Sequence, residues 1–149
     1  MPEPEFRQAT PADAKAIAAI GGQVWDELAE GSGFPQRPTL EGITDVLERE
    51  RAAIFVSEKG RSVSGFALLT PDPEDAEQAV MGVWLLPEDR RQGIGRELAL
   101  MATDFARSAG FGKLRGIIPK ANEPALSFFS DIGNLAQMVG QGMEYELPL

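Results

Sequence analysis

Three consecutive strand-forming segments in the middle of the chain constrain its fold more than any other feature. Apolar and β-branched residues predict strands over residues 52–57, 62–70 and 79–86. Residues 58–61, which include a glycine, predict a tight turn between the first two strands. Residues 71–75 contain two prolines and predict a break before the third strand. Strands joined by connections this short pair in an antiparallel arrangement, which indicates a hairpin at the centre of the fold.

Helical patterns flank these strands on both sides. Thr10, followed by Pro11, is typical of a helix start, and a second helix carries Leu40 and Ile43 on one face. The longest helical pattern covers residues 95–109. The remaining predicted elements are strands over residues 5–9, 113–119, 135–139 and 143–147, and a helix over 122–132. This order predicts an α/β fold with a mixed, mostly antiparallel sheet and flanking helices, in a single domain of residues 1–149.

The chain contains no histidine and no cysteine. Their absence excludes Ser-His-Asp and Cys-His nucleophiles, disulfides, and zinc bound by imidazole or thiolate, so we expect no metal site. Proton transfer near neutral pH must use a carboxylate, lysine, tyrosine, water or a chain terminus. The acidic residues 1–5 are unlike a signal peptide, and the longest apolar run, 79–86, is too short to cross a bilayer. We therefore expect a cytoplasmic protein that does not span a membrane.

The positive charge of this acidic chain is concentrated in one segment. The formal charge is −9, whereas residues 86–120 carry seven basic against four acidic side chains, which leaves −12 for the rest. Such acidity disfavours a partner as polyanionic as nucleic acid or an anionic membrane. The basic segment fits a specific anionic ligand, although arginines on a solvated face would give the same count.

The turn between the third strand and the longest helix is suited to binding phosphate. A helix N-terminus presents main-chain N–H groups and partial positive charge to an anion. Gly93 and Gly95 would let a phosphate approach the backbone, and Arg90, Arg91 and Arg96 add charge. The spacing matches neither the dinucleotide-binding fingerprint nor the nucleoside triphosphate loop. A Gly-x-Gly pair alone would also serve simply to turn a strand sharply into a helix.

The complete pattern around this turn resembles a known family. Arg90-x-x-Gly93-x-Gly95, preceded by Leu85-x-Pro87, is similar to the coenzyme A pyrophosphate loop of the GNAT superfamily of N-acetyltransferases. Two further segments resemble that superfamily, namely residues 6–13 and Asn122-x-x-Ala125-x-x-Phe128-Phe129-x-x-x-Gly133. Together with the order of elements, the resemblance covers essentially the whole chain.

The resemblance implies an acetyl-CoA-dependent N-acetyltransferase in which the amine of a small molecule or protein attacks the thioester directly. Acetyl-CoA would lie where the strand ending at Leu86 separates from the strand over residues 114–118. A main-chain N–H near Leu85 would polarise the thioester carbonyl, as in an oxyanion hole. The cofactor-binding residues implied are Leu85, Arg90, Arg91, Gln92, Gly93, Ile94, Gly95, Arg96, Asn122 and Phe129. Asn122 also fits a plain helix cap, and Phe129 fits core or cofactor packing.

The residues that would move protons are less well defined. Phe129 stands where the family often has a tyrosine that protonates the departing thiolate, and a phenyl ring cannot donate a proton. Water or a hydroxyl group would replace it, the candidates being Ser127, Ser130 and Tyr145. Glu77 is the first choice for the base because it immediately precedes the third strand. The alternatives are Asp26, Glu27, Glu30, Glu74 and Asp75. These acids could instead attract a cationic amine.

Two other functions fit the same sequence. One is a GNAT-like domain that binds an acyl-CoA with little or no catalysis and acts as a sensor or interaction module, which Phe129 favours. The other is an acidic interaction domain that retains the fold without the ligand, for which we would expect a blocked Gly93 turn and no separation of the two central strands. The acceptor amine is not defined by the sequence, and both a monomer and a homodimer are compatible with it.

Overall fold

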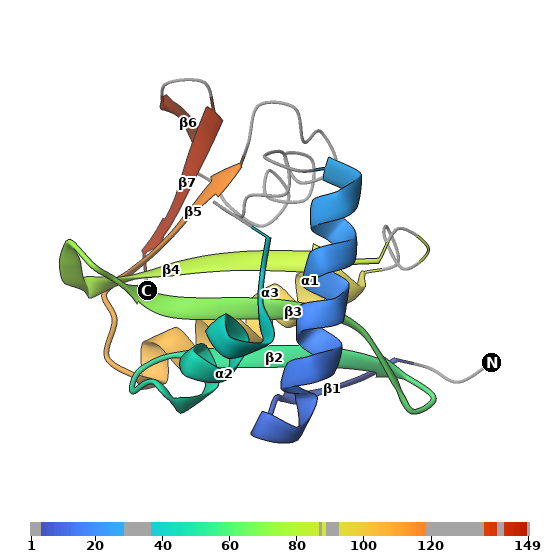
Figure 1. The fold of residues 1–149 in the computed structure, drawn as a ribbon. Helices are drawn as coiled ribbons and strands as arrows, with labels where there is room; N and C mark the ends of the chain where they lie inside the picture. Colours follow the sequence, from blue (N-terminus) through green and yellow to red (C-terminus); the bar gives the residue numbers. More distant parts are fainter. Residues whose placement is uncertain are drawn as a thin grey trace.

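One sheet runs through the part of the chain that the structure describes (Figure 1). The computed structural model describes residues 4–28, 37–86, 88, 93–118, 136–139 and 142–148, with the backbone alone after residue 115. The described strands are β1 (Glu5–Gln8), β2 (Ala53–Lys59), β3 (Ser62–Asp72), β4 (Asp75–Leu85), β5 (Lys113–Ile118), β6 (Ala136–Val139) and β7 (Gly142–Pro148). Their order in the sheet is β1-β2-β3-β4-β5-β7-β6. Among these strands β4 and β5 pair in parallel and all other neighbours are antiparallel, which confirms the predicted mixed, mostly antiparallel sheet.

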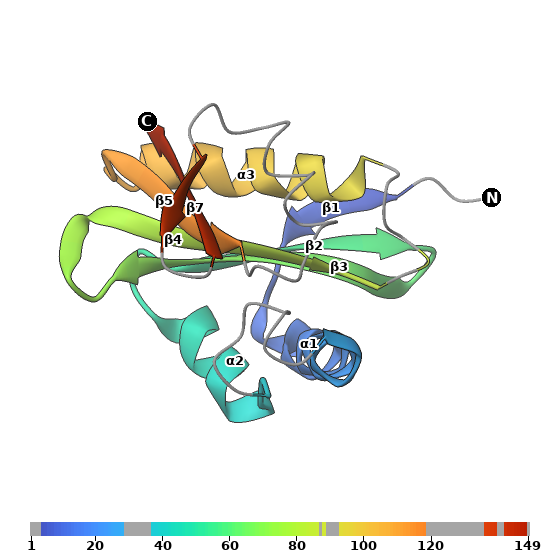
Figure 2. The ribbon, with the colours of Figure 1, turned by 90° about the horizontal axis from the view of Figure 1, so that it is seen from above.

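Helices cover both faces of this sheet (Figure 2). A short 3-10 helix, η1 (Pro11–Asp13), leads into α1 (Ala14–Leu28), which lies with α2 (Leu40–Glu48) on one face. Helix α3 (Ile94–Ser108), which is as long as α1, lies alone among the described helices on the other face. Thr39 caps α2, because its hydroxyl accepts a hydrogen bond from Gly42 N at 3.0 Å. No helix in the described part of the chain is long and apolar enough to cross a membrane.

Each face of the sheet has its own apolar core. Leu98 and Ala102 of α3 pack against Leu69 of β3 and Met81 of β4. On the opposite face, the core consists of residues from α1, α2 and the central strands: Ile17, Ile20, Val24, Ile43, Ile54, Val56 and Phe66. Because apolar side chains alternate between the two faces along β3 and β4, both strands are fixed in register.

The connection between β3 and β4 is tighter than the sequence predicts. β3 continues to Asp72 and β4 begins at Asp75, earlier than the predicted start at residue 79. Pro71 is tolerated within β3 because its nitrogen faces the β2 side, where pairing with β3 ends at Leu69. The missing N–H therefore costs no ladder hydrogen bond.

α1 also runs through the Gly21-Gly22 pair, which from sequence would weaken or split it. Both glycines are buried, and a Cβ on Gly22 would lie 2.8 Å from a guanidinium nitrogen of Arg37. That nitrogen is the end of a long, exposed side chain that can move aside. The low helix propensity of glycine is instead outweighed by the packing of α1 against the sheet through Ile17, Ile20 and Val24.

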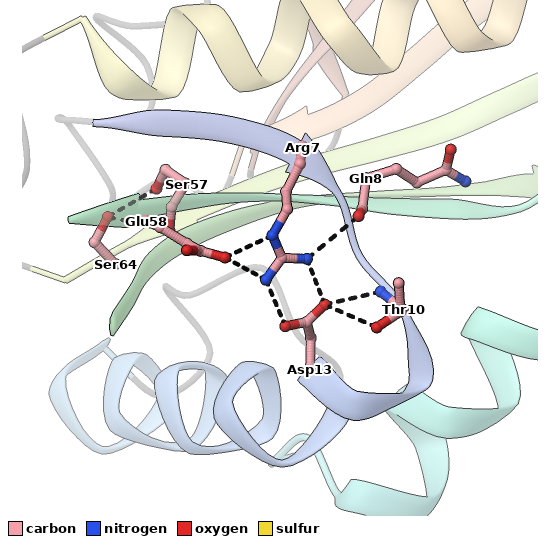
Figure 3. Close-up of polar contacts among 7 residues, drawn as sticks. All are labelled: Arg7, Gln8, Thr10, Asp13, Ser57, Glu58 and Ser64. Atoms are coloured by element: carbon pink, nitrogen blue, oxygen red, sulfur yellow. Dashed lines mark hydrogen bonds and ion pairs between the residues drawn. The ribbon is translucent and has the colours of Figure 1, made fainter. Parts of the chain in front are cut away.

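A buried carboxylate joins the first strand to the first helical turn (Figure 3). Asp13 accepts hydrogen bonds from Arg7 Nη1 and Nη2 at 2.7 and 2.8 Å, and from Thr10 N at 2.8 Å. Arg7 also pairs with Glu58 of β2. The hydrogen bonds from Arg7 are the main reason that the pKa of Asp13 falls from 3.8 to about 2. Because the folded-state pKa is the lower one, the stabilisation is present above pH 4 and is lost as the pH falls toward 2.

We expect Asp13→Asn to lower the free energy of unfolding at pH 7 by about 1–3 kcal/mol, because the amide cannot hold the charge-assisted bonds to Arg7. The variant should also lose less stability than the parent protein between pH 4 and pH 2. Urea denaturation at several pH values measures both effects. Asp45→Asn is the matched control, since Asp45 pairs with Arg49 on the exposed surface of α2 and its loss should cost under about 0.5 kcal/mol. Equal losses in the two variants would contradict a stabilising role for Asp13.

Candidate functional site

The parallel strands β4 and β5 separate soon after they meet. Their register pairs are Gln78–Lys113, Ala79–Leu114 and Val80–Arg115, although β4 continues to Leu85 and β5 to Ile118. Beyond this point β5 turns away with β7 and β6, and the opening between the strands widens toward the end of β4 (Figure 1). The two strands therefore separate where the sequence analysis expects them to.

Main-chain groups of alternate β4 residues face this opening. Leu86 N donates to a carbonyl of β3 at 3.3 Å, so even-numbered residues direct their N–H and C=O groups toward β3. Gly112 N donates to Glu77 O at 2.8 Å on the other edge, so odd-numbered residues face β5. Val83 and Leu85 therefore direct their N–H and C=O groups toward the side from which β5 diverges.

The two faces of β4 differ beside the opening. Val83 and Leu85 pack on the α3 side, whereas Trp84 packs on the side of α1 and α2. The Trp84 ring lies 5.2 Å from the Phe66 ring, measured between centroids, and it covers Gly82 so closely that a Cβ there would lie 2.2 Å from an indole carbon. Trp84 therefore lies on the side of β4 that α1 and α2 cover.

The N-terminus of α3 follows the open end of β4. Gly93 is the N-cap and has a left-handed φ of 83°, and a Cβ on it would meet no described atom within 4 Å. The first helical bond joins Glu97 N to Gly93 O, so the N–H groups of Ile94, Gly95 and Arg96 precede the helical ladder. The buried Ile94 side chain anchors this turn to the core, and Arg96 is exposed. The N–H groups on which the sequence-based prediction of an anion site rests therefore precede the ladder of α3.

The carboxylates proposed from sequence as bases lie in two separate places. Glu77 is exposed, and its N–H donates to Asp75 Oδ1 at 3.0 Å beside the β3–β4 turn. It lies six residues before Val83, about 20 Å along an extended strand, and so does not lie beside the residues predicted to hold the thioester. Asp26 and Glu27 lie in the last turn of α1, which extends past β4 on the side where β5 diverges (Figure 1). Asp26 is paired there with Arg37.

Three polar residues that the sequence does not single out for the site meet at the closed end. Asp72 Oδ2 accepts hydrogen bonds from Arg115 Nη2 at 3.0 Å and from Gln78 Nε2 at 2.9 Å. Its Oδ1 accepts from Glu74 N at 2.9 Å. The amide of Glu74, followed by the charge of Arg115, holds the pKa of Asp72 below its usual value. The sequence offers no signal for this cluster, because it joins residues of β3, β4 and β5.

The described residues bring together five of the residues predicted for the cofactor: Leu85, Gly93, Ile94, Gly95 and Arg96. Glu77 lies apart from them at the other end of β4. The other predictions fall outside the described residues, namely Arg90, Arg91, Gln92, Asn122 and Phe129, the helix over 122–132, and the alternatives Glu30, Ser127 and Ser130. Tyr145 lies on β7, which pairs with β5.

Comparison with known proteins agrees with this geometry. The model of the acetyltransferase (GNAT) family matches residues 21–133. Streptothricin acetyltransferase from Streptomyces lavendulae is 30% identical over 152 residues, which cover 87% of this chain and 80% of that protein. The paia N-acetyltransferase from Thermoplasma acidophilum, solved in complex with coenzyme A, aligns with a TM-score of 0.82 at 17% identity and covers 99% of both chains. The yncA protein from Salmonella typhimurium, solved with acetyl-CoA, has a TM-score of 0.81 at 19% identity and covers 98% of this chain and 94% of that one.

The family model spans most of the chain, and the described elements follow the predicted order. The chain therefore belongs to the GNAT family of acetyltransferases. One of the two features expected of an interaction domain without a ligand, the lack of separation between the central strands, is not found in the described residues, since β4 and β5 separate.

Proposed function

We propose that this chain is an acetyl-CoA-dependent N-acetyltransferase that transfers an acetyl group to the amine of a small molecule or protein. The observation that carries the proposal is the short pairing of β4 with β5, which ends at Val80 while β4 continues to Leu85 before the N-terminus of α3. An extended arm ending in a pyrophosphate fits this arrangement, because the edge of a strand pairs with the arm and a helix N-terminus binds the anion. The relatives solved with coenzyme A and acetyl-CoA support the same choice of cofactor.

Different residues of this chain would bind the different parts of acetyl-CoA. The N–H groups of Ile94, Gly95 and Arg96 would hold the pyrophosphate, together with the predicted contributions of Arg90, Arg91 and Gln92. Val83 and Leu85 would bind the arm through their main chains, and an N–H in this stretch would polarise the thioester carbonyl. Asn122 and Phe129 would complete the cofactor site, as the family resemblance implies.

When bound, acetyl-CoA supplies an acetyl group already activated as a thioester. The acceptor nitrogen forms a bond to the acetyl carbon as the carbon–sulfur bond breaks, and the nitrogen loses a proton while the sulfur gains one. The proton must pass to a group within hydrogen-bond reach of the acceptor nitrogen. Glu77, the first choice from sequence, lies about 20 Å before Val83 along β4, so Asp26 and Glu27 in the last turn of α1 are the candidates among the described carboxylates. Phe129 cannot return a proton to sulfur, so water or a hydroxyl group has that role.

Electrostatics favour a cationic acceptor. The chain outside residues 86–120 carries a formal charge of −12, and the C-terminal end of α1 adds its partial negative charge to those of Asp26 and Glu27. The relative from Streptomyces lavendulae is named for the acetylation of streptothricin. Streptothricin therefore belongs in the first panel of acceptors, beside diamines, amino acids and peptides with free N-termini.

The test is an acceptor screen in which free thiol and N-acetylated product are measured together, the first with a thiol reagent and the second by mass spectrometry. We expect at least one amine to give equal amounts of both. If acetyl-CoA raises the melting temperature but no amine in a broad panel releases coenzyme A, the alternative favoured by Phe129 is correct, and the chain is an acyl-CoA-binding sensor or interaction module. If acetyl-CoA does not bind at all, both functions are excluded.

A further inference from the structure

The Asp72 carboxylate ties three strands together at the closed end of the opening. It lies on β3, accepts a hydrogen bond from Gln78 on β4, and is paired with Arg115 on β5, 43 residues further along the chain. The side chain of Asp72 is only 5% exposed, and that of Arg115 is 24% exposed. The contact therefore crosses β4 inside the protein and joins its two neighbouring strands directly.

The position of this contact coincides with the point where the strands separate. Arg115 is the β5 member of the last register pair, with Val80, after which β5 leaves β4 (Figure 1). The main-chain ladder between the two strands consists of three register pairs. A ladder this short gives little resistance to sliding or to further pairing, so the side-chain contact supplies much of what fixes the point of separation.

We propose that Asp72 and Arg115 are positioning residues that set where β5 leaves β4, and so hold β5 and the end of β4 in the places from which both line the acetyl-CoA site. This inference rests on the proposed function. Without the contact, β5 would slide along β4 or lose its pairing with it. Either change would displace groups that must meet the cofactor together, and a displacement of about 1 Å is enough to weaken such a site strongly.

The chain contains a matched control for this idea. Asp13 is a second buried carboxylate paired with an arginine, but it lies in η1 and pairs with Arg7 of β1, the strand at one edge of the sheet. Asp72→Asn and Asp13→Asn make the same isosteric change, and both should lower the melting temperature of the free protein. Only Asp72→Asn should also weaken acetyl-CoA binding, by about tenfold in Kd, whereas Asp13→Asn should change Kd by less than about twofold.

The measurement is calorimetric titration of acetyl-CoA into each variant, well below the lowest melting temperature. Arg115→Lys, which keeps the charge, should recover most of the affinity that Arg115→Met loses. If Asp72→Asn does not fold, Gln78→Met tests the proposal in its place. This variant removes one hydrogen bond to Asp72 and keeps the ion pair with Arg115, so we expect the Kd for acetyl-CoA to rise by about threefold. The proposal is overturned if the variants at residues 72, 78 and 115 bind acetyl-CoA as tightly as Asp13→Asn does. Failure of the unmodified protein to bind would instead overturn the proposed function, and this inference with it.

Discussion

Replacement of both Gly93 and Gly95 by valine is expected to raise the Kd for acetyl-CoA by about 100-fold. Gly93 has a φ of 83°, a conformation that costs a residue with a side chain about 1–2 kcal/mol, and more when the residue is β-branched. The turn would therefore leave its present conformation, and its N–H groups would no longer converge on one anion. The loss of two charge-assisted hydrogen bonds, at about 1.5 kcal/mol each, corresponds to the expected change in Kd.

Gly110 provides the control for this prediction. It follows α3 at the other end of the helix, has a φ of 89°, and a Cβ on it would also meet no described atom within 4 Å. Gly110→Val should therefore introduce a similar backbone strain while leaving the Kd for acetyl-CoA within about twofold of the unmodified protein. Calorimetric titration measures the Kd of all three proteins. Equal values in the double variant and in Gly110→Val would show that the turn before α3 does not bind the cofactor.

Leu98→Ala is expected to lower the free energy of unfolding by about 2–5 kcal/mol. Leu98 is fully buried between α3 and the sheet, in the core formed with Leu69 and Met81, so its truncation leaves a cavity in addition to the lost apolar burial. A loss of this size is a large share of the stability of a domain this long. Urea denaturation followed by circular dichroism measures it.

Leu100 lies on the same helix and tests whether the loss comes from burial. Leu100 is 44% exposed, so Leu100→Ala should change the free energy of unfolding by only about 0.5 kcal/mol. The two variants share the same helix and the same chemical change. Similar losses at the two positions would contradict the packing of α3 described above.

The parts of the fold that follow from local sequence could be predicted. The pattern of apolar residues predicts where the strands β2, β3 and β4 lie along the chain, and the Gly-x-Gly pattern after β4 predicts the turn that begins α3. The turn needs a left-handed backbone at Gly93, next to the start of the helix, and this conformation favours glycine. The need arises from the residues beside Gly93, so the local sequence is enough to predict it. The turn that begins α3 is therefore predictable from the residues that form it.

Features that depend on distant segments could not be predicted in the same way. From its neighbours in the sequence, Pro71 predicts a break in the strand. In the structure it lies within β3, because the pairing of β3 with β2 ends at Leu69 and no hydrogen bond to β2 is needed at Pro71. Asp72 and Arg115 carry no motif, and only the sheet order brings β3 and β5 to the two sides of β4. The point where β4 and β5 separate thus depends on the contact between Asp72 and Arg115, which are 43 residues apart, and local sequence patterns cannot predict such a contact.

Calorimetric titration of acetyl-CoA into the unmodified protein tests the central claim most directly, since the claim is that the edge of β4 and the N-terminus of α3 form one acetyl-CoA site. We expect saturable binding of one acetyl-CoA per chain with a Kd in the micromolar range, and a melting temperature that rises with ligand concentration. The absence of both a binding isotherm and a shift in melting temperature at millimolar acetyl-CoA would contradict it.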